Sequence, residues 1–191
     1  MKNKIILVAG YPAAGKSTFS QELAQRLKIP CFNKDTIKEV MADGFGAPNK
    51  EVLNRDKRGS TATFMLMLHI AERFLQTGSI CILESNFLIH HPQPLSESEQ
   101  LEKLLKKYNS ECLTFVFKGD LDVISERYFN RDKERHWIHS RAENKDSIKH
   151  ICINARLGEI EIGQTVAVDA TSFSKINYND LYDIAQKFID S

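Results

Sequence analysis

The sequence predicts an α/β fold with three layers, in which helices cover both faces of a parallel sheet. Short apolar runs alternate along the chain with longer stretches of helical periodicity, which is typical of strands joined by right-handed helical crossovers. Several of these runs lack polar alternation, as do strands that are covered on both faces. The first run, residues 5–9, leads directly into a glycine-containing loop at 10–17, and a helical stretch follows. This order of elements predicts a ligand site at the carboxyl end of the sheet.

Five strands are expected, and turn or helix signals bound each of them. They comprise residues 4–9, a short strand that ends near 31–32, and residues 79–84, 112–118 and 165–169. The helical stretches are residues 17–27, 35–41, 60–76, 96–108, 121–135, 143–157 and 180–189. Residues 42–57 are the longest loop-like segment, which fits either a lid or acceptor-binding loop or a solvated excursion. Because no repeat or linker interrupts the pattern, residues 1–191 are expected to fold as a single domain.

The composition excludes several classes of protein. With 42% hydrophobic and 27% charged residues it is typical of a globular domain, and no apolar run approaches the roughly 20 residues that cross a membrane. The four cysteines are widely spaced, which favours reduced core residues in a cytoplasmic protein. A cleaved signal peptide would remove the glycine-containing loop, so none is expected. The formal net charge of +1 does not favour a nucleic-acid partner, although a local basic groove remains open.

The loop GYPAAGKS at residues 10–17 matches the phosphate-binding pattern G-x-x-x-x-G-K-[ST]. Its glycines permit dihedral angles that turn successive backbone N–H groups toward phosphate oxygens, and the positive end of the next helix adds to the attraction. Lys16 would reach the β- and γ-phosphates of a nucleoside triphosphate, and the Ser17 hydroxyl would help to hold Mg²⁺. The predicted nucleotide contacts are Gly10, Pro12, Ala13, Ala14, Gly15, Lys16, Ser17 and Thr18.

Asp35 and Lys38 follow the second expected strand. Asp35 could cap the helix that begins here, and it could also accept the proton of a hydroxyl that attacks phosphorus, an effect worth about 10²–10⁴ in rate. These two roles are compatible. Lys38, one helical turn later, could neutralise acceptor or phosphate charge, or it could face the solvent. We predict that Asp35 is the catalytic base and that both residues contact the acceptor.

Glu84, Ser85 and Asn86 follow the apolar residues of the third expected strand. An acidic residue after an apolar strand is the Walker B arrangement, which holds Mg²⁺ directly or through water. Many strands end in an acid, so this pattern alone is not specific. The phosphate loop upstream makes it so. We predict a metal site formed by Ser17 and Glu84, with Ser85 and Asn86 as acceptor contacts.

Arg127, Arg131 and Arg135 recur every four residues and would share one face of a helix. Guanidinium groups can clamp the charge of a transferred phosphoryl group, but the interleaved acids also fit a solvated face with salt bridges. The stretch 127–141 is basic and aromatic, which favours an arginine lid over about residues 121–157, with Arg127 and Arg131 as catalytic phosphate contacts. Beyond the fifth strand, backbone groups around Thr171 could line the adenine pocket.

These motifs resemble those of the small P-loop kinases related to nucleoside monophosphate kinases. The likeness is to ATP-dependent kinases with an AAA-type domain and to the kinase domain of polynucleotide kinase, and more distantly to chloramphenicol phosphotransferase and the zeta toxins. It extends from Ile5 to Ile189, and its specific parts are GYPAAGKST at 10–18, FNKDTIK at 32–38, ILESNF at 82–87 and the arginines around 127–131. The family often has glycine where Ala13 stands, which implies a stiffer loop here.

The resemblance implies a P-loop NTPase fold with a sheet of order 2-3-1-4-5, a lid after the fourth strand, and phosphoryl transfer from ATP to a hydroxyl. Asp35 matches the aspartate that activates the acceptor, and Lys38 matches a basic residue that follows it. Glu84 stands where many relatives have aspartate, which leaves direct metal ligation open. We expect a Mg²⁺-dependent kinase with a small-molecule hydroxyl acceptor. The alternatives are a P-loop ATPase or nucleotide-switched binding protein, and a nucleic-acid 5′-hydroxyl kinase.

Overall fold

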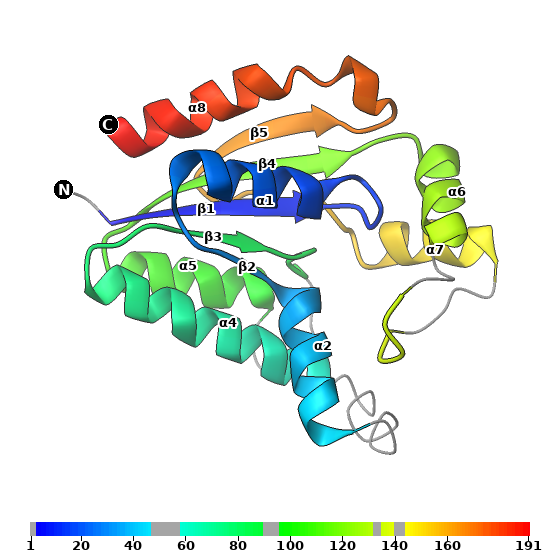
Figure 1. Ribbon diagram of the computed structural model, residues 1–191, viewed down its shortest axis with the longest axis horizontal. Coiled ribbons are helices and arrows are strands. Elements are labelled where there is room, and N and C mark those ends of the chain that lie inside the picture. Colours follow the sequence, from blue (N-terminus) through cyan, green and yellow to red (C-terminus); the bar gives the residue numbers. More distant parts are fainter. Residues whose placement is uncertain (1–2, 47–57, 90–95, 132–134, 140–143) are drawn as a thin grey trace.

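The computed structural model describes residues 3–46, 58–89, 96–131, 135–139 and 144–191. These residues form a three-layer α/β structure around a five-stranded sheet in the order β2-β3-β1-β4-β5 (Figure 1). The strands are all parallel and comprise β1 (Lys4–Gly10), β2 (Cys31–Asn33), β3 (Cys81–Glu84), β4 (Glu111–Lys118) and β5 (Gln164–Asp169). The predicted fold class and strand order are therefore confirmed.

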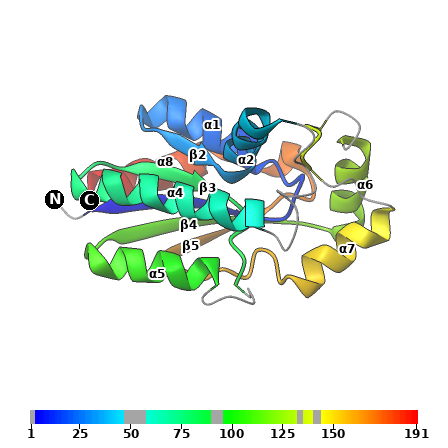
Figure 2. The same ribbon diagram turned by 90° about the horizontal axis from the view of Figure 1, so that it is seen from below.

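Helices cover both faces of the sheet, as Figures 1 and 2 show. One face carries α1 (Lys16–Leu27) and α8 (Tyr178–Asp190), and the other carries α4 (Arg58–Gln76) and α5 (Glu97–Lys107). Three helices lie toward the carboxyl ends of the strands, namely α2 (Lys34–Phe45), α6 (Leu121–Arg131) and α7 (Lys145–Asn154). A short 3-10 helix, η4 (Phe173–Lys175), follows β5. No helix in the described parts of the chain combines the length and apolarity that a bilayer span requires.

β1 is the central strand, and every one of its residues is buried. Ile5 and Leu7 pack into the core beneath α4 and α5, whereas Ile6 and Val8 pack into the core beneath α1 and α8. A strand with a core on each face has no polar side, which explains its continuous apolar sequence. The two cores also fix the end of β1, where the glycine-containing loop begins.

Two of the differences between predicted and observed boundaries bear on the site. α2 continues through Phe45, so residues 42–45 are helical and not part of a loop; residues 47–57 of that predicted loop lie outside the described residues. Ala42 is fully buried and α2 packs against α4, which favours a helix that continues past Ala42. α6 ends at Arg131 and residues 135–139 are not helical, so Arg135 does not share a helical face with the other arginines. The sequence RDKER at 131–135 offers no apolar side chain on which a helix could pack.

Candidate active site

The loop between β1 and α1 lies close to β4. The backbone N–H of Tyr11 donates to the carbonyl oxygen of Phe117 over 2.8 Å. Gly10 has a φ of +122°, and a Cβ at this position would lie 1.9 Å from the same oxygen, so only glycine fits. Gly15, at φ 86°, immediately precedes α1. Ala13 has a φ of 58°, a left-handed conformation that costs an alanine about 1–2 kcal/mol, so the loop stores strain.

Lys16 is buried at the start of α1. Its ammonium donates to the carbonyl oxygens of Gly10 over 3.2 Å and of Tyr11 over 2.7 Å, which folds the side chain back over the loop. Burial lowers the pKa of Lys16, and the carboxylates of Glu84 and Asp35 partly oppose this shift. The ammonium is thus held by exchangeable neutral acceptors, from which it can turn to a phosphate.

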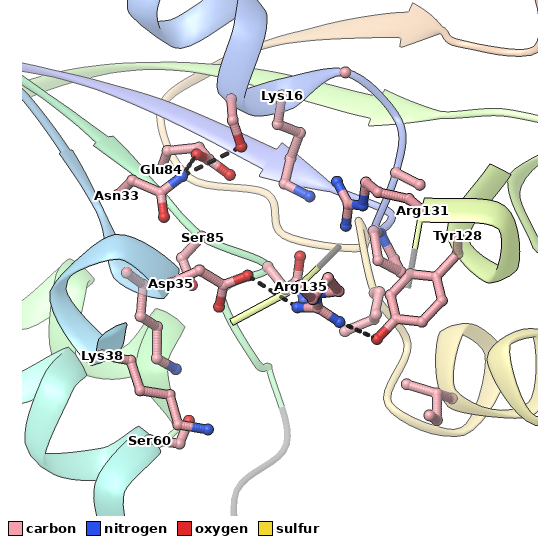
Figure 3. A pocket seen from close by; sticks show the side chains of 18 of the residues that line it. Lys16, Asn33, Asp35, Lys38, Ser60, Glu84, Ser85, Tyr128, Arg131 and Arg135 are labelled. Carbon is pink, nitrogen blue, oxygen red and sulfur yellow. Dashed lines mark hydrogen bonds and ion pairs between the residues drawn. The ribbon is translucent and has the colours of Figure 1, made fainter. Parts of the chain in front are cut away.

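Asn33 connects the two residues that the sequence predicts as metal ligands. The parallel register of β2 and β3 places Asn33 beside Glu84, and its Nδ2 donates to a carboxylate oxygen of Glu84. The same amide donates to the Ser17 hydroxyl over 3.3 Å (Figure 3). Glu84 is buried, and this burial raises its pKa although Lys16 and Ser17 favour the charged form. The role of Asn33 was missed because it depends on the neighbouring strand.

This donor set fits Mg²⁺ bound together with a nucleotide. Mg²⁺ prefers oxygen ligands and usually takes only one or two from the protein, with phosphates and waters completing the octahedron. The Ser17 hydroxyl and the Glu84 carboxylate supply that number. Within the described ranges no cluster of three or more His, Cys, Asp or Glu side chains could form a separate metal site.

Asp35 is not the N-cap of α2, which corrects one of its two predicted roles. The cap is Asn33, whose side-chain oxygen accepts from the backbone N–H of Thr36 over 3.0 Å. Asp35 lies in the first turn, with its side chain 63% exposed and one carboxylate oxygen 3.6 Å from Arg135. Asparagine caps helices about as well as aspartate does, and α2 begins one residue after Asn33, so Asn33 takes this role. The structure leaves Asp35 available for chemistry.

A cleft of about 290 Å³ brings most of the predicted site residues together. It is lined by Pro12, Ala13, Gly15, Lys16, Ser17 and Thr18 from the phosphate loop and the start of α1, and by Asp35, Lys38, Glu84, Ser85 and Asn86 from α2, the end of β3 and the residues after it. Figure 3 shows Lys16 and Arg131 at one end, with Asp35 and Lys38 at the other. Arg131 also lines the cleft and lowers the pKa of Lys16 by its charge, which places it near the loop.

Arg127, on α6, points instead to the loop that follows β5. Its guanidinium donates to the carbonyl oxygens of Ala170 over 2.6 Å and of Thr171 over 2.7 Å, and it lies 4.0 Å from the ring centroid of Phe173. The ring of Phe173 in turn lies beside Gly15, where an added Cβ would be 3.1 Å from it. Arg127 and Thr171 are therefore brought together, but neither of them lines the cleft. The phosphate contact of Arg127 stays a prediction.

Several lining residues were not predicted as site residues. Lys34 and Glu97, which both line the cleft, form a buried ion pair, and Glu97 also accepts from the backbone N–H of Leu88 over 3.1 Å. Ser60, Tyr128 and Arg135 line it as well. Lys34 is adjacent to Asp35 and could have been noticed as a charged residue at a strand end. Ser60 comes from α4, and no signal in the sequence connects it to the site.

This chain matches a known protein family and resembles several solved structures. A family model for an AAA domain matches residues 5–151. A solved structure described as a "putative kinase" from Chloroflexus aurantiacus is 28% identical, with a TM-score of 0.82 and 98% of each chain covered. A sugar kinase from Janibacter sp. HTCC2649 is 12% identical, with a TM-score of 0.61 over 100% of this chain and 95% of that one. Shikimate kinase from Bacteroides thetaiotaomicron is 14% identical, with a TM-score of 0.60 and 98% of each chain covered.

No curated protein gives a significant match to the sequence. The family match nevertheless covers more than half of the chain, including the phosphate loop, Asp35, Glu84 and Arg131. The solved structures share the arrangement of the whole chain. The chain therefore belongs to the AAA-domain family and has the fold of the small P-loop kinases.

Proposed function

We propose that this chain is a Mg²⁺-dependent kinase that transfers the γ-phosphoryl group of ATP to a hydroxyl of a small molecule, acting as a single cytoplasmic domain. One observation carries the proposal: Lys16 and the Ser17–Asn33–Glu84 group face Asp35 across one cleft. The names of the sugar kinase and the shikimate kinase, which share the fold, agree with a small hydroxyl acceptor.

Different residues would carry out different parts of the reaction. The loop amides and Lys16 would bind the triphosphate, while Ser17 and Glu84 would hold Mg²⁺, which neutralises phosphate charge. Asp35 would accept the proton of the acceptor hydroxyl while the oxygen of that hydroxyl forms a bond to the γ-phosphorus. The bond from that phosphorus to the β–γ bridging oxygen breaks, and ADP leaves.

The predicted lid arginines would act at two places. Arg131, beside Lys16, would stabilise charge on the transferred group. Arg127 would hold the loop around Thr171 against the adenine base, and it would contact phosphate only if its guanidinium left the carbonyl oxygens of that loop. Lys38, Ser85 and Asn86 would position the acceptor, because they line the same cleft as Asp35.

A screen of hydroxyl compounds for stimulated ADP release tests the proposal. Sugars, polyols and hydroxy acids are offered with Mg²⁺-ATP, and the Lys16→Ala protein serves as the blank. We expect at least one small compound to raise ADP release by wild type and none to do so with Lys16→Ala. Slow hydrolysis that is indifferent to every compound would instead indicate an ATPase or a nucleotide switch. Stimulation by 5′-hydroxyl oligonucleotides alone, lost at higher salt, would indicate a nucleic-acid kinase.

A further inference from the structure

Three acidic residues of α2 contact one short segment from the far side of the cleft. Asp35, Glu39 and Asp43 recur every four residues and so share a helical face. The segment is residues 135–139, which we call the strap. Each acid meets a different part of the strap, so the strap, which turns at residues 137–138, lies against this face of α2.

The contacts are one arginine pair and two histidine pairs. Arg135 lies 3.6 Å from a carboxylate oxygen of Asp35. His139 Nε2 lies 2.8 Å from Glu39 and His136 Nε2 lies 2.9 Å from Asp43, and the indole N–H of Trp137 also donates to Asp43 over 3.3 Å. These contacts fix the strap at several points along the helix.

The strap also has an inner side. Ile138 is fully buried and His139 is 8% exposed, although both lie in a segment without regular structure. Burial on this scale holds a segment in place more strongly than exposed ion pairs do. The strap is therefore a packed part of the molecule, and its first residue is Arg135.

Tyr128 of α6 fixes the guanidinium of Arg135. The Tyr128 hydroxyl accepts a hydrogen bond from Arg135 Nη1, and the guanidinium lies 5.1 Å from the centroid of the ring. The ring itself packs against the small core around Ile148 and Cys152 of α7. Figure 3 shows Arg135 between Asp35 and Tyr128, so one guanidinium connects α2 to α6.

We propose that Arg135 is a positioning residue that holds the Asp35 carboxylate toward the cleft, with Tyr128 and the strap holding Arg135 in turn. This inference rests on the proposed role of Asp35 as the base. The Asp35 carboxylate is more exposed than buried, so core packing does not select its rotamer and a directional partner must do so. A reacting group misplaced by about 1 Å can cost about 10²-fold in rate. Arg135 thus acts on the acceptor side of the cleft, whereas Arg131 acts on the nucleotide side.

Kinetics with the acceptor found by the screen test the positioning. We expect Arg135→Gln to lower kcat by about 10–100-fold with little change in KM for ATP. Arg135→Lys should recover only part of the loss, because a single ammonium cannot reach Asp35 and Tyr128 together as the planar guanidinium does. Arg73→Gln removes an arginine from the surface of α4 and serves as the control. A kcat of Arg135→Gln within twofold of wild type overturns the inference and leaves the proposed function standing.

A double-mutant cycle separates action through Asp35 from direct contact with phosphate. If Arg135 works by holding Asp35, adding Arg135→Gln to Asp35→Asn should cause no further loss of kcat. Losses that multiply would mean that Arg135 contacts the phosphoryl group by itself, which overturns the inference. Tyr128→Phe keeps the ring and removes the hydroxyl, so its effect should likewise vanish in the Arg135→Gln background. A parallel fall in Tm and rise in KM for ATP would indicate a merely structural role and also count against it.

The placement of the strap can be tested without nucleotide or acceptor. Burial lowers the pKa of His139 below its ordinary 6.5, and the charge of Arg135 lowers it further, while Asp35 and Glu39 oppose the shift. NMR titration of the ring protons, assigned with a His139→Gln variant, should show a pKa below 6.5 that rises in Arg135→Gln. A wild-type His139 that titrates at 6.5, or that ignores Arg135→Gln, would show that the strap does not lie on α2. This result stands apart from the screen, whose failure would count against the proposed function.

Discussion

Asp35 and Glu84 are both carboxylates of the same cleft, but their surroundings give them different chemistry. Asp35 is largely exposed and faces a guanidinium, so it stays available to an incoming acceptor. Glu84 is buried beside an amide and a hydroxyl, which are the surroundings of a ligand that must keep its place. Two identical functional groups are thus suited to different roles by burial and by hydrogen bonding.

Replacing Asp35 by asparagine should lower turnover while sparing nucleotide binding. The amide keeps the shape of the side chain but cannot accept the acceptor's proton, so we expect kcat to fall by about 10²–10⁴-fold. Steady-state kinetics at saturating acceptor measure kcat, and calorimetry with Mg²⁺-ATP measures affinity. Wild-type turnover in Asp35→Asn would show that another group, or none, removes the proton.

The pH dependence of Glu84 gives a second prediction at this scale. Since burial raises its pKa above the ordinary 4.5, the folded state binds the proton more tightly than the unfolded chain. Wild-type stability should therefore fall as pH rises from 4.5 through the raised pKa, and this component should be missing in Glu84→Gln. Urea unfolding of both proteins across this range measures it. Mg²⁺ affinity should move in the opposite direction, because only the carboxylate binds the ion.

At the scale of elements, the junction of β2 and α2 combines a structural role with a functional one. Asn33 caps α2 through its side-chain oxygen and connects Ser17 to Glu84 through its nitrogen. A single side chain thus aligns the first turn of α2, which carries Asp35, with the end of β3. We predict that the distance between the proposed base and the proposed metal site depends on this residue.

Two substitutions of Asn33 should separate its roles. Asn33→Ala removes both and should lower the free energy of unfolding by about 1 kcal/mol through the lost cap alone. Asn33→Ser restores a good cap but is too short to reach Glu84, so stability should recover while Mg²⁺-dependent turnover stays low. Urea unfolding and steady-state kinetics are compared across the three proteins. Full activity in Asn33→Ser would mean that the connection to Glu84 is dispensable.

At the scale of the whole molecule, one sheet with a core on each face holds the site. The loop, the end of β3 and the start of α2 converge because parallel strands all end at the same edge. The cores on either side fix these ends, whereas α6, α7 and the strap approach from beyond the sheet. Ligand binding should therefore stabilise the fold as a unit.

Thermal unfolding with Mg²⁺-ATP tests this expectation. A ligand at 100 times its Kd adds about 2.7 kcal/mol to the free energy of unfolding. For a chain of this length that corresponds to a rise in Tm of roughly 5–10 °C. The shift should be absent in Lys16→Ala, whose own Tm without nucleotide is the control for folding. A similar shift in both proteins would place the nucleotide outside the loop.

Several features of the molecule were predictable because they depend on local sequence or on a repeated pattern. Apolar strands alternating with helical periodicity predict the parallel sheet, and the loop at 10–17 predicts the turn that requires Gly10 and Gly15. The ends of the strands then single out Glu84, which ends β3, and Asp35, which follows β2 by two residues, because the strands of such a sheet end at one edge. These inferences need only spacing and residue type.

Other features depend on which side chains meet across the fold, and spacing alone does not determine that. Asn33 caps α2 because the helix begins at Lys34 and the Asn33 side-chain oxygen accepts from the N–H of Thr36, whereas Asp35 already lies within the first turn. The four-residue spacing of the arginines predicts one shared face, yet the carbonyl oxygens after β5 hold Arg127 and the helix ends before Arg135. The sequence by itself determined the sheet and the phosphate loop, because strand and turn preferences are local. Only the tertiary structure decided the partner of each charged side chain, because long side chains pair with whatever the fold brings near.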